Sequence, residues 1–178
     1  MIFRALLTTL MICAAASAYA ATGPATKKEE PVEISASRSL EWNRRAKTYT
    51  ARQNAVAKQG NFQISSDTIT ARYNDNQGAT HIFQMEAAKN VVIVSPPYTA
   101  YGDQAVYDVA EDRATLTGQD LRIVTETEKL TAKDRVEFFS KENRMVASGG
   151  ATAKRGTDSL KAEKMEAFFQ KNAEGTLK

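Results

Sequence analysis

The sequence predicts an all-β fold built from repeated short antiparallel strands, and two observations predict it. The stretch Gly102–Gly118 returns 31 positions later as Lys133–Gly149. Inside each copy, apolar and polar residues alternate as on a half-buried strand, and a charged turn, a second short strand and a glycine follow. A return of about 30 residues is typical of stacked architectures. Because one hairpin cannot bury its apolar face alone, we expect the copies to share one continuous apolar interior.

The two copies agree in the residues expected to shape turns and in those expected to face inward. The matched pairs are Asp103 and Asp134, Ala105 and Val136, Tyr107 and Phe138, Glu111 and Glu142, Asp112 and Asn143, Arg113 and Arg144, and Gly118 and Gly149. A weaker third copy follows 29 residues further on, where Met165 meets Val136. Acidic residues that recur at the same place in each unit are expected to shape turns, not to perform catalysis.

The first 20 residues have the features of a secretory signal peptide. Arg4 supplies a positive start, Ala5–Ala16 an apolar run, and Ala18-Tyr19-Ala20 a small-residue cleavage site. We expect cleavage near Ala20, a flexible linker over residues 21–31, a folded domain over residues 32–170 and a flexible tail over residues 171–178. The alternative is an uncleaved membrane anchor, although the apolar run is short for a membrane span.

Composition excludes several classes of function. Cys13 is the only cysteine and lies in the signal segment, so the mature chain would have no disulfide, thiolate metal site or cysteine nucleophile. The chain has 24 Lys and Arg against 21 Asp and Glu, and loss of Arg4 leaves a net charge of about +2. Because the charges are balanced and interspersed, we expect no nucleic-acid partner.

The first half of the domain divides into short strands separated by polar turns. The expected strands are Val32–Ser35, Ser39–Asn43, Ala46–Ala51, Asn54–Ala57, Phe62–Asp67 and Thr68–Tyr73. Asn74–Gly78 is the strongest turn in the chain, since Asn, Asp and Gly tolerate the left-handed backbone of tight turns.

The second half begins with two more strands, His81–Ala87 and Asn90–Val94. Val91–Val94 is a run of four β-branched residues, so we expect it to be buried or to pair centrally, and Pro96-Pro97 should end it. The repeat then occupies the rest of the domain. Leu160–Gln170 contains good helix formers, but its match to the second copy favours a strand, with a helix as the alternative.

The sequence indicates no catalytic residue, no metal site and no cofactor. His81 is the only histidine and lies in an alternating strand, where a structural role is expected. There is no glycine-rich phosphate loop, and a Ser/His/Asp arrangement has no support. The informative residues are the inward apolar ones. Periodicity alone leaves two interpretations open, an ordinary filled core and an interior that holds acyl chains.

A family resemblance rests on the order of motifs at the start of the domain. These motifs are Val32 and Ile34, Ser39–Trp42, Thr48–Thr50, Asn54–Ala57 with Gln59-Gly60, and Ile64–Asp67. In this order they resemble the opening of the LptA/OstA family of periplasmic lipopolysaccharide-transport proteins, and the repeat looks like later units of that family. The resemblance covers about Val32 to Gln170. This chain departs from it by an Arg52-Gln53 insertion and by a shortened stretch between Gly78 and Ile82.

The resemblance implies a twisted, half-open β-jelly roll whose interior shields the acyl chains of lipid A. Together with the inward pattern, it predicts lipid contacts at Val32, Ile34, Ile64, Ile69, Tyr73, Ile82, Tyr107, Val136 and Phe138. Tyr73 stands where the family pattern has a cation, so no phosphate contact carries over to it. The resemblance also implies stacking head to tail through edge strands, predicted at Val32, Glu33, Ile34 and Ser35 and at Met165, Ala167 and Phe169.

The leading hypothesis is a non-enzymatic periplasmic protein that carries lipopolysaccharide from the inner to the outer membrane. Its implied partners are lipopolysaccharide, an LptC-like inner-membrane component, an LptD-like outer-membrane component and further copies of itself. A membrane-anchored LptC-like component is one alternative, and cleavage at Ala20 would separate the two. A structural β-repeat protein without lipid is another. A lipid-modifying hydrolase ranks last because the sequence supplies no recognisable nucleophile and base.

Overall fold

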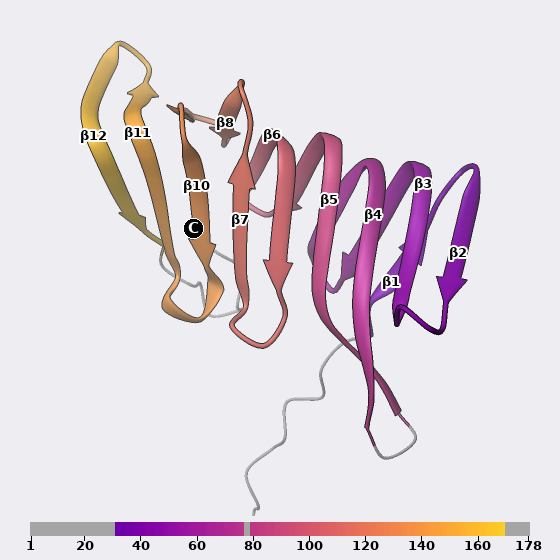
Figure 1. The fold of residues 1–178 in the computed structure, drawn as a ribbon. Coiled ribbons are helices and arrows are strands. Elements are labelled where there is room, and N and C mark those ends of the chain that lie inside the picture. The colour runs from indigo at the N-terminus through magenta and orange to yellow at the C-terminus, as the bar shows by residue number, and fades with distance from the viewer. Residues whose placement is uncertain (1–30, 77–78, 170–178) are drawn as a thin grey trace, which may run out of the picture.

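The computed structural model describes residues 31–76 and 79–169, and within these residues it is almost entirely antiparallel β-sheet (Figure 1). The predicted all-β class is therefore confirmed. The strands are β1 (Glu33–Ser35), β2 (Ser39–Asn43), β3 (Thr48–Gln59), β4 (Phe62–Asn76), β5 (Ala79–Ser95), β6 (Tyr98–Asp108), β7 (Arg113–Thr117), β8 (Leu121–Val124), β9 (Glu128–Ala132), β10 (Arg135–Phe139), β11 (Arg144–Arg155) and β12 (Asp158–Phe168), with a short 3₁₀ turn, η1 (Ser140–Glu142). Within the described part, no helix is both long and apolar enough to cross a membrane.

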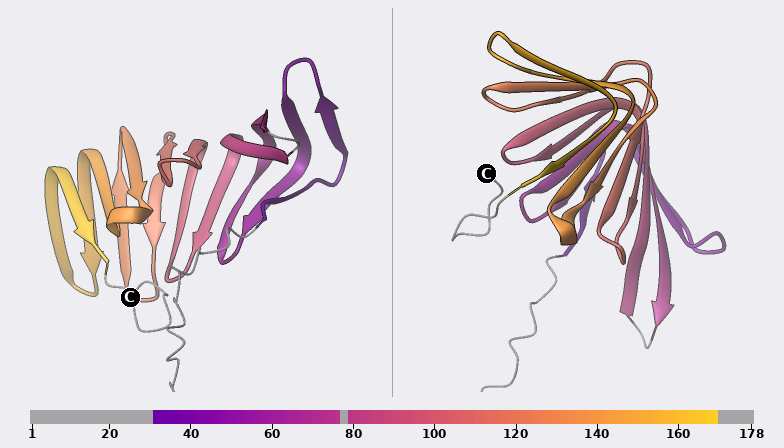
Figure 2. Two further views of the ribbon diagram at one scale, coloured as in Figure 1. Left: turned by 90° about the horizontal axis from the view of Figure 1, so that it is seen from below. Right: turned by 90° about the vertical axis from the view of Figure 1, so that its left-hand side faces the viewer.

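The long strands bend in the middle and belong to two layers of the same sheet (Figure 2). The first layer contains β2, β7 and β10, and the second contains β1, β8 and β9. Strands β3, β4, β5, β6, β11 and β12 contribute one half to each layer. The layers meet at the bends and diverge towards the hairpin turns, a side that we call the mouth.

Several of the predicted short strands are the two halves of one bent strand, so those predictions were wrong. All of Asn54–Ala57 and all but the first two residues of Ala46–Ala51 fall in β3, and His81–Ala87 and Asn90–Val94 both fall in β5. The register shifts between Arg52 and Ala55 in β3 and between Ala88 and Val91 in β5. Each shift contains two residues with positive φ, which interrupt the pairing without reversing the chain.

The repeat corresponds to two successive hairpins, β6–β7 and β10–β11, which lie side by side in the first layer. Asp112 and Asn143 occupy the same left-handed position in the two copies, with φ of 53° and 47°. At the other end of the unit, a Cβ on Gly118 would lie 2.5 Å from the Asp103 nitrogen, and one on Gly149 would lie 2.6 Å from both Asp134 carboxylate oxygens. The recurring residues therefore shape turns, as predicted.

The central strand and the last strand agree with the sequence, whereas the longest hairpin differs. β5 pairs with β4 and β6, and Val91 and Ile93 are each only 1% exposed. It ends at Ser95, directly before Pro96-Pro97. β12 is a strand and not a helix. The predicted turn Asn74–Gly78 is too long, because β4 continues through Asn76 and β5 begins at Ala79, which leaves the turn at positions outside the described residues.

The core lies between the two layers and is narrow at the bends. Its largest fully buried side chains are Ile64, Ile69, Ile93, Leu116, Leu121, Val91 and Val136. Many of the remaining buried positions are alanines, such as Ala51, Ala55, Ala100 and Ala147. At the bend of β6, a Cβ on Gly102 would lie 2.9 Å from Leu116 and 3.0 Å from Leu121. Small residues thus let the layers converge, as close packing requires.

Candidate lipid-binding interior and strand edges

All nine positions predicted to contact lipid belong to the interior between the layers. Ile64, Ile69, Tyr73, Tyr107, Val136 and Phe138 are buried, at 0 to 6% exposure. Val32, Ile34 and Ile82 are only partly buried and pack against the same core. The two groups therefore differ in what they offer a ligand. A ligand can contact the partly buried residues in the structure as described, whereas the buried residues become accessible only if the layers separate.

Aromatic rings from opposite layers meet near the mouth. Phe62, at the start of β4, lies 5.1 Å from Tyr107, near the end of β6. Tyr98, at the start of β6, stacks on Phe138 of β10, with 5.1 Å between the ring centroids. The Tyr98 ring also contacts Phe169, with 5.6 Å between the centroids. Such ring pairs contribute about 0.5–1.5 kcal/mol each beyond their buried area. They hold the mouth together.

At the mouth, neighbouring residues orient the hydroxyl of Tyr107 and raise the pKa of Tyr98. The Tyr107 hydroxyl donates a 2.8 Å hydrogen bond to Oδ1 of Asp112, so a turn residue of the repeat also fixes an interior ring. Burial raises the pKa of the Tyr98 phenol, a hydrogen bond with Ser95 opposes this, and the negative charge of Asp112 adds to it. The Tyr98 ring therefore remains neutral and apolar in its site.

Phe62 and Tyr98 were not among the predicted site residues. Alternation carried a signal for both, because Phe62 lies two residues before Ile64 and Tyr98 two residues before Ala100. Alternation does not predict which residue of the opposite layer each ring contacts. Each ring meets a residue of the opposite layer, and that contact depends on where the strand bends.

The N-terminal end of the sheet is formed by β1 and β2, which both pair with β3. Sequence analysis predicted only the β1 part, Val32–Ser35, of this edge. On β2, Leu40 lies across from buried Ala51 and Trp42 lies across from Tyr49, so both share the interior face. They are nevertheless 56% and 51% exposed. The apolar interior therefore continues onto this edge without cover.

A group of rings organises the N-terminal edge. Tyr49 lies 5.8 Å from Trp42 and stacks on Tyr73 at 4.8 Å. The Trp42 indole nitrogen donates a 2.7 Å hydrogen bond to the Tyr73 hydroxyl, and the Arg44 guanidinium lies 4.1 Å from the Trp42 ring centroid. The half-exposed Trp42 ring is thus contacted by Tyr49, Tyr73 and Arg44.

The C-terminal end of the sheet is formed by β12, which pairs with β11 along both halves. This edge is longer than the predicted positions Met165, Ala167 and Phe169 indicate, since β12 begins at Asp158. Met165 and Ala167 lie across from Ala147 and Met145 and pack partly against the core, as does Phe169. Leu160 lies across from Ala153 and is 67% exposed, so the interior face is open at this end as well.

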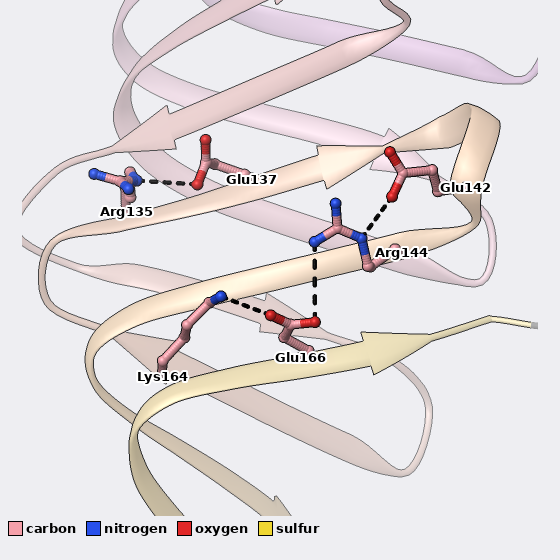
Figure 3. A network of polar contacts seen from close by, with 6 residues as sticks. All are labelled: Arg135, Glu137, Glu142, Arg144, Lys164 and Glu166. Carbon is pink, nitrogen blue, oxygen red and sulfur yellow. Dashed lines mark hydrogen bonds and ion pairs between the residues drawn. The ribbon is translucent and has the colours of Figure 1, made fainter.

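The outer face near the C-terminal edge carries charged residues on β10, η1, β11 and β12 (Figure 3). Arg144 lies 2.7 Å from Glu142 and 3.9 Å from Glu166, and Lys164 lies 2.6 Å from Glu166. The hydrogen bond with Glu142 raises the pKa of Arg144, and the hydrogen bond with Lys164 lowers the pKa of Glu166. Exposed pairs of this kind contribute little stability, so the network mainly keeps this face polar.

Within the described residues, no three His, Cys, Asp or Glu side chains are arranged to hold a metal ion. His81 lies exposed on β5. Ion pairs link Glu111 to Arg113 and Glu142 to Arg144 in the two copies of the repeat. The acidic residues of the repeat are thus used in turns and local pairs.

Comparison with known proteins identifies the family. Residues 33–134 match the family model described as "LptA/(LptD N-terminal domain) LPS transport protein", a span of more than half the chain. The chain belongs to this family. The resemblance inferred from the order of motifs is thereby confirmed, and so is a role in lipopolysaccharide transport and not in catalysis. The β10–β12 part lies beyond the matched span and continues the same architecture.

The fold is also found in a solved structure. LptH from Pseudomonas aeruginosa, described as the LptA homologous periplasmic component of the conserved lipopolysaccharide transport device, matches with a TM-score of 0.59. The sequence identity is 16%, and the match covers 78% of this chain and 95% of LptH. The fold is therefore the β-jelly roll of LptA-type proteins, as predicted. No curated protein matched the chain.

Proposed function

We propose that this chain binds the acyl chains of lipopolysaccharide between its two layers and forms part of a bridge from the inner to the outer membrane. One observation carries the proposal. The apolar interior face reaches both ends of the sheet and is left uncovered there, at Leu40 and Trp42 on one side and at Leu160 on the other. A groove that is meant to continue into a neighbouring molecule has this property, whereas a closed core does not.

Binding requires the mouth to open, and the energies permit it. Each buried CH₂ contributes about 0.8 kcal/mol, so an acyl chain with a dozen of them contributes about 10 kcal/mol. The ring contacts that join the layers, Phe62 with Tyr107 and Tyr98 with Phe138, contribute about 0.5–1.5 kcal/mol each beyond their area. A lipid would first meet the partly buried Val32, Ile34 and Ile82, and would then replace the contacts between the layers.

The strand directions support a head-to-tail stack. Every pairing from β3 to β12 is antiparallel, and β12 therefore runs in the same direction as β1 and β2. In a head-to-tail stack, β12 would pair in parallel with the next molecule. Asp158–Ala162 would lie beside its β1, and Lys164–Phe168 would lie beside its β2. β-Augmentation of this kind satisfies backbone groups that an edge leaves unpaired.

The proposed location is the periplasm, after cleavage near Ala20. The support is the composition of residues 1–20, which lie outside the described part of the chain. The proposed partners are an LptC-like component at one end of the stack and an LptD-like component at the other. The membrane-anchored LptC-like role remains the second candidate, and the N-terminal sequence of the purified protein separates the two.

Photo-crosslinking to lipopolysaccharide tests the proposal at matched positions. A photoreactive residue is placed at Ile34 or Ile82, which face the interior, and at their neighbours Glu33 or His81, which are exposed. Adducts are expected at the first pair only, because acyl chains enter between the layers. Adducts at neither pair would indicate a β-repeat protein with a filled core and would remove the basis of the proposal. Equal labelling would indicate adsorption to the surface.

A further inference from the structure

Strands β3, β4 and β5 arch side by side at the bend of the N-terminal half (Figure 1). The side chains at this bend line a polar groove. We call it the bend groove. It has a volume of about 510 Å³, and the residues that matter for its chemistry are Arg38, Arg52, Gln53, Asn54, Asp67 and Lys89. Arg52 lies in register with Ser39 on one side and with Thr68 on the other, and Thr68 in turn pairs with Ala88. The groove therefore crosses β3, β4 and β5 and reaches Arg38, directly before β2.

Its walls are built from irregular backbone. Gln53 and Asn54 have φ of 66° and 49°, and Lys89 and Asn90 have φ of 65° and 53°. Asparagine tolerates this left-handed region, but glutamine and lysine seldom adopt it. Residues held in such conformations gather at ligand sites. The bend explains why two unpaired residues interrupt each of β3 and β5. It does not explain why one of each two is a glutamine or a lysine.

The cations of the groove have no anionic partner among the described residues. Arg38, Arg52 and Lys89 line it, and none of them takes part in an ion pair there. Asp67 is the one carboxylate in the lining, and it accepts a 3.1 Å hydrogen bond from the Asn90 amide. The groove thus has an excess of two positive charges, together with the neutral amides of Gln53 and Asn54.

We propose that the bend groove binds a phosphorylated sugar. Arginine and lysine are suited to phosphate, which accepts several charge-assisted hydrogen bonds. The amides and the Asp67 carboxylate offer the donors and acceptors that sugar hydroxyls need. The volume falls in the range of small-molecule sites. The proposed site does not rest on lipid binding between the layers.

The test is a titration of the ¹⁵N-labelled protein followed by NMR, with glucose 6-phosphate as the probe. Amide shifts of Gln53, Asn54 and Lys89 are expected to move and saturate. Inorganic phosphate is expected to act more weakly and glucose not at all. In Arg52→Gln/Lys89→Gln, we expect binding to weaken by about tenfold for each cation removed. Added salt should also weaken it, since the cations are exposed.

The matched control is Lys129→Gln/Lys154→Gln, which removes the same charge from exposed residues that pair between β9 and β11, outside the groove. It should bind like the unchanged protein. Three results would overturn the proposal: no saturable shift, equal weakening in both double variants, or phosphate alone binding as tightly as glucose 6-phosphate. Displacement of the probe by lipopolysaccharide would assign the sugar phosphate to a lipid headgroup, and no displacement would assign it to a free sugar. Both outcomes support the site.

Discussion

At the scale of single residues, each copy of the repeat is closed by an aspartate and a glycine that face each other across the sheet. The Asp103 carboxylate accepts a 2.8 Å hydrogen bond from the Gln119 nitrogen, next to Gly118. In the second copy, the backbone nitrogen of Asp134 donates to the Ser148 oxygen, next to Gly149. The aspartate fills the space that a side chain at the glycine would take. This explains why the two residue types recur together.

Gly149→Ala is expected to destabilise the protein by about 2–4 kcal/mol. The backbone there has φ of 85°, which costs a non-glycine residue about 1–3 kcal/mol, and the new Cβ would also lie 2.6 Å from the Asp134 carboxylate oxygens. The measurement is the free energy of unfolding in urea. The midpoint should fall while the slope of the transition stays the same.

Gly156→Ala serves as the control. Its φ of 54° is also positive, but a Cβ at Gly156 would have no atom within 4 Å. It should therefore show only the backbone part of the effect, about 1 kcal/mol. If both variants lost the same stability, the contact with Asp134 would not be the reason for the glycine in the repeat.

At the scale of elements, the sequence predicted strands well where they are straight and poorly where they bend. The bounds of β2 were predicted correctly as Ser39–Asn43 because turn residues flank it on both sides. β3 was divided in two because the predicted strands Ala46–Ala51 and Asn54–Ala57 left Arg52-Gln53 between them. In the structure, β3 pairs with β4 on both sides of Gln53 and Asn54, so these two residues bend the strand and do not reverse the chain. That information is not local.

For the candidate site, the sequence predicted which residues face the interior but not which of them lie at an open edge. Alternation together with the family resemblance gave the nine proposed lipid-contact positions, and in the structure they are buried or pack against the core. It did not identify Leu40 and Trp42 as part of the open interior face. Their exposure depends on β2 being the last strand of its layer, and edge position follows from the topology of the whole sheet.

Phe62→Ala is expected to speed the entry of lipid. The ring of Phe62 contacts Tyr107 across the mouth, and its removal lowers the cost of separating the layers by about 1 kcal/mol. The rate of photolabelling by lipopolysaccharide, with the probe at Ile82, should therefore rise about fivefold. The matched control is Phe83→Ala, because Phe83 is an exposed phenylalanine of β5. An unchanged rate in Phe62→Ala would mean that these rings do not limit entry.

At the scale of the whole molecule, the described strands leave only two unpaired edges, β1 with β2 at one end and β12 at the other. Each edge carries exposed residues of the interior face. In the proposed stack, these residues become buried together with the strand pairing. Both parts of the junction, backbone hydrogen bonds and apolar contact, are thus present in the single chain.

Leu160→Lys is expected to weaken self-association at least about tenfold. Leu160 is 67% exposed in the single chain, and burying a leucine in the junction contributes about 1.5–3 kcal/mol that a charged residue would oppose. Sedimentation velocity over a range of concentrations measures the effect. Val106→Lys is the control, since Val106 is an exposed apolar residue in the middle of the sheet. If the two variants associated equally, β12 would not be the contact.

The parallel relation between β12 and the first strands gives the molecule a front and a back. If a twofold rotation made the two ends of a unit equivalent, copies could join in either orientation. A row of such copies would have no polarity. In the proposed stack, each added copy would repeat the orientation of the one before, so a row would have one β1 and β2 end and one β12 end, whatever its length. A row of such units would distinguish one membrane from the other by its ends alone.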